Sequence, residues 1–331
     1  MGEIMMKEHN SKVNANDINK NDSTVRGNFL LKYAILAPSC LNTQPWRFEA
    51  RPNEIRIFGD LKRWRKVADM DQRELYISIG CALENILIAA EHFGYGHRVT
   101  YLEGEQVAAV IELNAGGKPS SFRDAELFKA IPERHTIRKI YEKRTLPPET
   151  TKCLEELCIE EDFALHFTDD IEIRRKAKEL VYRAYAIQLS KSTRKRELGY
   201  WLARGNTGKN RPISKIGQII TNCLNVSKNG AKKDSDILMS APILAAITSE
   251  NNGHRSQIVA GQILERIWLK ANTLGIGFRP MSCILQVPEL SENVLDFLHV
   301  SDVFLQQTFM LGYAKTDEKH ASRRPLDQFI I

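Results

Sequence analysis

LYISIGCALENILIAAEHFGYGHR at residues 75–98 and SQIVAGQILERIWLKANTLGIGFR at residues 256–279 are built alike. Each is a long apolar run at helical spacing that ends in Gly-x-Gly, a pattern typical of a buried helix and its exit turn. Aligned without a gap, they share the pairs Gly80/Gly261, Leu83/Leu264, Glu84/Glu265, Ile86/Ile267, Ala90/Ala271, Gly94/Gly275, Gly96/Gly277 and Arg98/Arg279. Any two buried helices share aliphatic residues, but coinciding glycines, glutamates and arginines favour an internal duplication.

A glycine in the middle of each helix indicates that a neighbouring element packs closely there. If the two copies pack against each other, the chain forms a pseudo-twofold particle, the single-chain equivalent of a symmetric dimer. The predicted fold is therefore α+β: a central, mostly antiparallel sheet wrapped by helices, duplicated into two interlocked halves. The two long glycine-ended helices are expected at the interface between the halves.

Hydrophobic periodicity outside these helices predicts the remaining elements. Further helices are expected over residues 25–37, 125–131, 148–157, 171–190 and 289–298, and strands over 54–58, 98–102, 108–113, 243–248 and 307–313. The predicted organisation is a disordered polar tail over 1–24, a first half over 25–129 and a second half over 130–331. Within the second half, the polar stretch 185–235 is a candidate insertion.

Composition restricts the class of protein. The 331 residues are 43% hydrophobic and 27% charged, which is typical of a globular chain. No apolar run reaches the roughly 20 residues that span a bilayer, and the polar N-terminus lacks the apolar core of a secretory signal. Six cysteines without a CxxC pair favour a reducing cytoplasm over a disulfide framework or a metal site. We therefore expect a cytoplasmic protein without a membrane partner.

The net charge of +6 leaves nucleic acid, an acidic surface or an anionic small molecule open as partners. The densest cationic stretch, KSTRKR at residues 191–196, lacks the interleaved aromatic residues of a single-strand binding platform. A solvated helix end is the favoured interpretation of this stretch, and no nucleic-acid partner is predicted.

The segment APSCLNTQPW at residues 37–46 is the first candidate binding loop. Pro38 and Pro45 fix the backbone at both ends. Between them, Ser39, Asn42 and Gln44 offer a short row of donors and acceptors, which suits a planar heteroaromatic ligand. The same residue types also cap and turn a chain without any ligand, and the residues alone leave both interpretations open.

The segment RHTIR at residues 134–138 is the second candidate. Arg134, His135, Thr136 and Arg138 place cations and a hydroxyl within five residues. Guanidinium groups with a hydroxyl or imidazole donor are what a phosphate monoester requires. Taken alone, the segment also fits a solvated basic loop, which is the commoner case.

Both segments resemble signatures of the nitroreductase-type flavoproteins. APSCLNTQPW is similar to the family's APSxxNxQPW string, and RHTIR followed by LPPE at 146–149 is similar to its phosphate-binding string and helix start. The resemblance implies FMN as cofactor, with Pro38, Ser39, Asn42 and Gln44 along the flavin ring. It implies Arg134, His135, Thr136 and Arg138 as phosphate contacts.

The order of the two strings is reversed from that of ordinary family members, where the phosphate string comes first and FMN lies at a dimer interface. Here each half keeps one complementary string, so the resemblance is to the duplicated, single-chain (Acg-type) branch. One complete flavin site per chain is expected, in a pseudo-dimer whose further oligomeric state is open. No metal is predicted.

Two further pairs follow from the resemblance. Ser282 and Cys283 fall where the family has the Glu-Gly whose backbone approaches flavin N5, and this departure leaves the usual glutamate role without a counterpart. Arg323 and Arg324 are similar to the basic residues that close on the phosphate, although they also fit a mobile tail.

The activity implied is that of an oxidoreductase in which flavin N5 performs the chemistry without a catalytic side chain. NAD(P)H would reduce FMN in a ping-pong cycle, and an electron-poor nitroaromatic or quinone would reoxidise it. The alternative is an FMN storage protein in which residues 185–235, with Tyr200, Trp201 and Arg204 at their middle, form a lid. A cofactor-free interaction protein is the third alternative. The physiological acceptor and the choice between NADH and NADPH are not readable from the sequence.

Overall fold

The computed structural model describes residues 23–103, 107–205, 230–315 and 320–331. All but the last two residues of the predicted N-terminal tail, and the centre of the predicted insertion, lie outside these ranges. No helix among the described residues is long and apolar enough to cross a membrane.

The first half holds a four-stranded sheet. Its elements are α2 (Ser23–Ala34), the turn η2 (Cys40–Asn42), β1 (Trp46–Arg51), β2 (Glu54–Gly59), α3 (Arg73–His92), β3 (Tyr95–Tyr101) and β4 (Val107–Ala115). The strand order is β1-β2-β4-β3, and every neighbouring pair is antiparallel.

The second half holds the other sheet. It follows α4 (Ala125–Ala130), which ends the predicted first half. Its elements are α5 (Pro148–Glu155), β5 (Phe163–Thr168), α6 (Ile171–Ser190), α7 (Ser192–Gly205), a helix over residues 230–240, β6 (Ile243–Ser249), α9 (His254–Thr273), β7 (Gly277–Pro280), α10 (Pro288–Leu298) and β8 (Phe304–Gly312). The strand order is β5-β6-β8-β7, again antiparallel throughout.

The two sheets have the same topology. In each, the second strand is followed by a long helix, and the fourth strand inserts between the second and the third. Even the register shift between the second and fourth strands recurs, at Ile57/Phe58 and at Ile247/Thr248. The α+β class with antiparallel sheets and helices around them is confirmed, and the predicted central sheet consists of one four-stranded sheet in each half.

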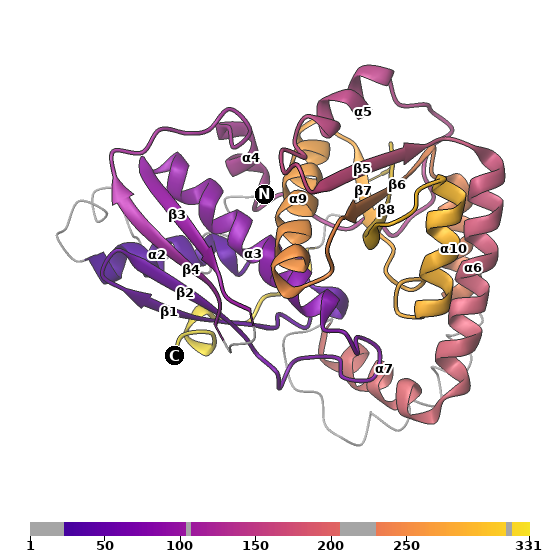
Figure 1. Cartoon of the computed structure of the whole chain (residues 1–331), viewed down its shortest axis with the longest axis horizontal. Helices are drawn as coiled ribbons and strands as arrows, with labels where there is room; N and C mark the ends of the chain where they lie inside the picture. The colour runs from indigo at the N-terminus through magenta and orange to yellow at the C-terminus, as the bar shows by residue number, and fades with distance from the viewer. Residues whose placement is uncertain (1–22, 104–106, 206–229, 316–319) are drawn as a thin grey trace.

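Helices α3 and α9 pack against each other between the two sheets, as Figure 1 shows. Gly80 and Gly261 meet at the point of contact: a Cβ on Gly80 would lie 1.9 Å from the Ile258 carbonyl oxygen, and one on Gly261 2.1 Å from the Ile77 carbonyl oxygen. Any side chain would force the helices apart, so the two predicted glycines set the interface. The helices then exit through Gly94 and Gly275, both with positive φ.

The end of the chain returns to the first half. Phe48 of β1 donates its N–H to the Phe329 carbonyl at 2.8 Å and accepts from the Ile331 N–H at 2.9 Å. Figure 1 shows this C-terminal segment (yellow) beside β1. The last residues of the predicted second half thus pack on the first half, and they bring Arg323 and Arg324 with them.

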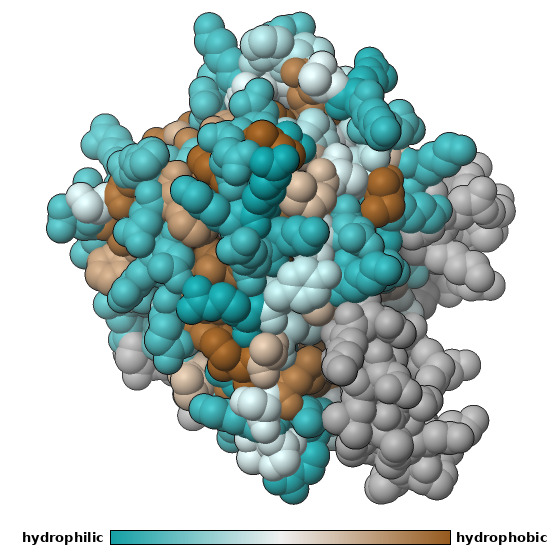
Figure 2. All heavy atoms as spheres, turned by 90° about the vertical axis from the view of Figure 1, so that its right-hand side faces the viewer, coloured by the Kyte–Doolittle hydropathy of each residue, from teal (hydrophilic) through white to brown (hydrophobic). Residues whose placement is uncertain are grey.

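The opposite end of the molecule is covered by α6 and α10. Figure 2 shows a mainly hydrophilic face on this side, with apolar residues scattered over it. The partly exposed Ile171, Tyr182 and Ile187 lie along α6. The elements that position the candidate site are at the centre of the molecule instead, where α3, α9 and the C-terminal segment meet.

Candidate functional site

The loop that begins after α2 has an unusual backbone. Leu41, Asn42 and Gln44 have φ values of 50°, 56° and 50°, in the left-handed region that residues other than glycine rarely adopt. Each such residue stores on the order of 1–3 kcal/mol of strain, which persists only where the surroundings enforce it. The Ser39 Oγ accepts the Gln44 N–H at 2.9 Å and helps to hold this shape. Strained residues cluster at ligand sites, which supports the prediction that this loop binds something.

Residues 322–324 of the C-terminal segment clamp the loop. The Asn42 side-chain amide donates to the Ser322 carbonyl at 2.9 Å. The Arg324 N–H donates to the Oε1 atom of the buried Gln44 at 3.0 Å. Asn42 and Gln44 were predicted to lie along a flavin ring. In the structure they also form hydrogen bonds that hold the C-terminal segment against the loop.

Arg134 joins the second motif to the first. It follows α4, is 5% exposed, and donates from Nη2 to the Leu36 carbonyl at 3.1 Å. Its guanidinium lies 4.5 Å from the ring centroid of Trp268 in α9. The two segments, about a hundred residues apart in sequence, therefore meet directly.

Arg323 reaches the same carbonyl from the other side. Its Nη2 donates to Leu36 at 2.8 Å and to Ala37 at 3.2 Å. Burial, with the nearby charge of Arg134, lowers the pKa of Arg323 to about 9. His135 faces His320 with 5.9 Å between the ring centroids, and its Nδ1 lies 3.0 Å from the Glu133 carbonyl oxygen.

These side chains keep several buried polar atoms without a hydrogen-bond partner. They are Arg134 Nε, His135 Nε2, Ser322 Oγ, Arg323 Nε and Arg324 Nη1. A buried donor without an acceptor costs about 1–3 kcal/mol, so a cluster of them is unfavourable in a site that binds nothing. An anion with several acceptor oxygens would satisfy them. The donor set therefore fits a phosphate.

Glu265 of α9 is the acidic neighbour of this cluster. It is fully buried, its Oε1 lies 3.4 Å from Arg134 Nε, and neither oxygen accepts a hydrogen bond. Burial raises the pKa of Glu265 to about 7, although Arg134 acts in the opposite direction. The two guanidinium groups of Arg134 and Arg323 are thus balanced by only one nearby carboxylate, that of Glu265, among the described residues.

Glu84 of α3 is the residue paired with Glu265 in the sequence alignment, and its surroundings differ. Arg123 donates to both of its oxygens at 2.7 and 3.1 Å, and Gln262 donates at 3.0 Å. Arg266 lies at 3.3 Å and also pairs with Glu160. Burial alone would raise the pKa of Glu84, but Arg123 and Arg266 lower it below its usual value. The chain's own side chains fill this half of the pseudo-symmetric arrangement.

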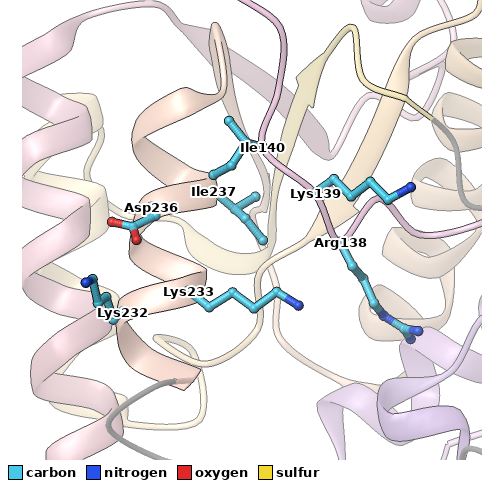
Figure 3. Close-up of a pocket in the computed structure, with 7 residues that line it drawn as sticks. All are labelled: Arg138, Lys139, Ile140, Lys232, Lys233, Asp236 and Ile237. Atoms are coloured by element: carbon cyan, nitrogen blue, oxygen red, sulfur yellow. The ribbon is translucent and has the colours of Figure 1, made fainter.

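Arg138 lines a cavity of about 520 Å³, and no contact joins its side chain to Arg134 or Arg323 among the described residues. The cavity is lined by Arg138, Lys139, Ile140, Lys232, Lys233, Asp236 and Ile237. In Figure 3, Ile140 and Ile237 lie together, and Arg138, Lys139 and Lys233 extend to one side. Arg138 is exposed, so the structure brings together only part of the RHTIR motif. Thr136 lies between the two parts.

Ser282 and Cys283 lie beyond β7. The Ser282 hydroxyl is 3.4 Å from the Gln307 side-chain oxygen, and the Cys283 carbonyl accepts from Gln188 at 2.7 Å. Burial, with the charge of Asp234, raises the pKa of the Cys283 thiol to about 12. The thiol therefore stays protonated at neutral pH, which favours a structural role over a nucleophilic one.

A hydrogen-bond chain that sequence reasoning missed links this region to the binding loop. Gln286 donates to Glu74 at 2.8 Å, and Glu74 accepts from Arg65 at 3.0 Å. Arg65 also lies 2.9 Å from the Cys40 sulfur in η2. No local pattern identifies Arg65 or Glu74, because their partners come from distant parts of the chain.

Helix α7 lies against the binding loop and packs on η2. Glu197 accepts the N–H groups of Val67 and Ala68, both at 2.9 Å. The Arg63 guanidinium lies 5.5 Å from the ring centroid of the buried Trp201. The first part of the predicted lid is thus anchored beside the site, and residues 206–229 lie outside the described part of the chain. Within that part, no group of His, Cys, Asp and Glu could hold a metal.

Comparison with known proteins tests the resemblance. No family model matches the chain. Two Mycobacterium tuberculosis sequences, from strains CDC 1551 and H37Rv, are provisionally named NAD(P)H nitroreductases. Each is 23% identical over 293 residues, which cover 86% of this chain and 84% of the relative.

Solved structures give weaker matches. An FMN-bound nitroreductase from Bacteroides fragilis and the NADPH complex of the FMN-dependent nitroreductase NfnB from Mycobacterium smegmatis are each 16% identical, with TM-scores of 0.41. They cover 60% and 61% of this chain, and 96% of their own. At these TM-scores the structural matches do not add to the argument. The sequence relatives do: this chain is similar along most of its length to two proteins named NAD(P)H nitroreductases, in agreement with the resemblance of the two motifs.

Proposed function

We propose that this protein is an FMN-binding oxidoreductase of nitroreductase type. The observation that carries the proposal is the convergence of Arg134 and Arg323 on the Leu36 carbonyl, at the entrance to the strained APSCLNTQPW loop. The similarity to proteins named NAD(P)H nitroreductases supports the choice of cofactor and donor.

The phosphate of FMN would be held by Arg134, His135 and Arg323, with Arg324 and Thr136 at its edge. Two guanidinium groups against one poorly bonded carboxylate leave an excess of positive charge that a phosphate would balance. Backbone and side-chain groups of Pro38, Ser39, Asn42 and Gln44 would face the flavin ring. Ser282 and Cys283 remain proposed for the N5 side of the ring. Arg138 remains proposed as a phosphate contact, but a solvent-exposed one that contributes less than the buried arginines.

When bound, FMN would supply hydride chemistry at its N5 between NAD(P)H and an electron-poor acceptor of nitroaromatic or quinone class. The chain's part is to bind and orient. The clamp of residues 322–324 on Asn42 and Gln44 fixes the loop before the ligand arrives, which lowers the entropic cost of binding. No side chain of the site is proposed to transfer a proton.

One site per chain is part of the proposal, with the pseudo-dimer of the duplicated, Acg-type branch formed inside a single, cytoplasmic chain. The contrast between the halves supports this part of the proposal. Arg123 and Arg266 pair with the Glu84 carboxylate, whereas the donors near Glu265 include buried atoms without a hydrogen-bond partner.

An FMN storage protein is the second candidate, favoured by the position of α7. Its contacts through Glu197 and Trp201 place a helix directly beside η2, where it would restrict access to the flavin ring. Such a protein would hold FMN with little or no turnover.

An anaerobic mixing experiment separates the two. Purified protein loaded with FMN is mixed with NADPH or NADH, and the flavin absorbance is followed. Reduction should be complete on the order of seconds for an enzyme that turns over at ordinary rates. Bleaching with either donor, reversed by a quinone, supports the oxidoreductase. Persistent absorbance with both donors supports storage, and failure to bind FMN overturns both.

A further inference from the structure

Glu265 has no role in the function proposed above, although it is the buried acid closest to the proposed phosphate contacts. It is 0% exposed, and both of its oxygens lack a hydrogen bond. A buried carboxylate in that condition is expensive to keep charged. The fold nevertheless holds it 3.4 Å from the Nε of Arg134.

The groups that surround Glu265 come from several elements. From α3 these are Cys81, Glu84 and Asn85; from the loop after α4, Arg134; and from the C-terminal segment, Arg323. Elsewhere along α9, Arg266 pairs with Glu84 and Glu160, and Lys270 lies 3.8 Å from Asp124 of α4. Arg134 and Arg323 are thus the two cations that favour the ionised form of Glu265, whereas burial and Glu84 favour the protonated form.

We propose that Glu265 is a positioning residue whose negative charge is replaced by that of the ligand. As a carboxylate, Glu265 balances the charges of Arg134 and Arg323, and it takes up a proton when a phosphate pairs with these arginines. The proposal rests on the proposed function, since it assumes that the ligand is a phosphate held by these arginines. A phosphate dianion near the two guanidinium groups cancels the potential that stabilises the Glu265 carboxylate. The carboxyl group, already desolvated, then becomes neutral.

The sign of the pH dependence follows. The pKa of Glu265 is about 7 before the ligand binds, and the phosphate raises it further. Below pH 7 the group is already protonated and binding takes up little. Above pH 7 binding must take up a proton, so the affinity falls by up to about tenfold per pH unit. The ligand's own phosphate has a pKa near 6 and acts in the opposite direction, because the dianion gains population as pH rises.

His135 and His320 also lie close to Arg134, and burial, with the charge of His135, lowers the pKa of His320 from its usual value. A substitution at Glu265 separates their contribution. Glu265→Gln keeps the size of the side chain and removes its charge. It disturbs only the weak contact with the Asn85 side chain, because neither oxygen accepts a well-formed hydrogen bond. Glu84→Gln at the equivalent position of the other helix is the matched control.

The test is a titration with FMN and with riboflavin, which lacks the phosphate, from pH 6.5 to 8.5, followed by flavin fluorescence. Calorimetry at pH 8 in two buffers of different ionisation enthalpy counts the protons taken up. We expect FMN affinity to fall at least tenfold across this range in the parent and in Glu265→Gln to fall much less. We expect proton uptake at pH 8 only with FMN.

An equal fall in the parent and in Glu265→Gln, or equal proton uptake with riboflavin, would overturn the exchange and leave the FMN site standing. Absence of FMN binding at every pH would overturn the proposed function and the exchange together. A Glu84→Gln protein that loses the pH dependence as completely as Glu265→Gln would also contradict the assignment to Glu265.

Discussion

Glu84 and Glu265 occupy equivalent positions on helices α3 and α9, but their hydrogen-bond partners differ. Glu84 accepts hydrogen bonds from Arg123 and Gln262 and lies beside Arg266, whereas Glu265 accepts none. Each half follows its last strand with a segment that carries an arginine to its glutamate, Arg123 in one half and Arg323 in the other.

The difference lies in what else the arginine contacts. Arg123 is bound to Glu84 and Glu91, so its charge is balanced within the fold. Arg323 donates to the carbonyls of Leu36 and Ala37 and keeps a buried Nε without a partner. One half therefore holds a completed ionic core, and the other holds the unpartnered donors to which we propose that an anion binds.

The largest expected effect is on ligand binding at the unsaturated half. Replacing Arg134 and Arg323 together by alanine should weaken FMN binding by about 3–6 kcal/mol, since each charged hydrogen bond contributes roughly 1.5–3. Fluorescence titration measures this loss. Arg138→Ala is the comparison variant and should lose far less, because Arg138 is exposed and water screens its charge. Equal losses in the two variants would remove the distinction between the cluster and the cavity.

The next effect is on folding at the saturated half. Glu84→Ala leaves Arg123 and Arg266 buried without their carboxylate, which should lower the free energy of unfolding by about 3–5 kcal/mol. Urea denaturation followed by circular dichroism measures it. Glu265→Gln disturbs only the weak contact with Asn85 and should cost far less at neutral pH. Equal losses of stability in the two variants would show that Glu84 is no better paired than Glu265.

A third prediction concerns the pH dependence of ligand-free stability. The pKa of Glu265 is raised from 4.5 to about 7, so its folded form binds the proton more tightly than its unfolded form. The contribution of Glu265 to the free energy of unfolding is therefore fully present below pH 4.5. It falls by about 3 kcal/mol as the pH rises to 7. Glu84, whose pKa is lowered, has the opposite sign and loses stability as pH falls.

Thermal melts of the parent and of Glu265→Gln at pH 5 and pH 8 test this third prediction. The variant should resemble the parent at pH 5 and be the more stable protein at pH 8. A parent whose advantage over the variant grows with pH would contradict it.

The smallest effect is expected where α7 meets the first half. Glu197→Gln weakens the bonds to the N–H groups of Val67 and Ala68 and should lower stability by about 1 kcal/mol. If α7 restricts access to the flavin, FMN release should also become several-fold faster, measured by dilution into apo-protein acceptor. Glu126→Gln, on the exposed face of α4, is the control and should change neither value. Unchanged release in Glu197→Gln would argue against a lid at this helix.

The sequence predicted the parts of this comparison that depend on local pattern. The buried helices α3 and α9 were recognisable because their apolar spacing runs through five turns and ends in Gly-x-Gly. The two motifs also predicted that the Arg134 loop and the Leu36–Ala37 turn lie close together, because the resemblance implies that both contact one ligand. Ile171–Ser190 was predicted as a helix with the bounds that the structure gives.

Other parts depended on tertiary contacts that no local pattern contains. Strands β1 and β5 were missed because they lie at sheet edges with mixed polar and apolar residues, and β7 because it is only four residues long. Helix α7 was read as a polar stretch, since its basic first turn and internal glycine are poor helix signals. The exposure of Arg138 and the lack of hydrogen-bond partners at Glu265 depend on chain segments far away in sequence.

The stoichiometry of FMN binding tests the contrast between the halves most directly. Apo-protein at a concentration well above Kd is titrated with FMN, and the break in flavin fluorescence is read in the parent and in the Arg134→Ala/Arg323→Ala variant. The account predicts one FMN per chain in the parent and no saturable uptake at the same concentrations in the variant. Two FMN per chain, or one that binds the variant as tightly as the parent, would contradict it.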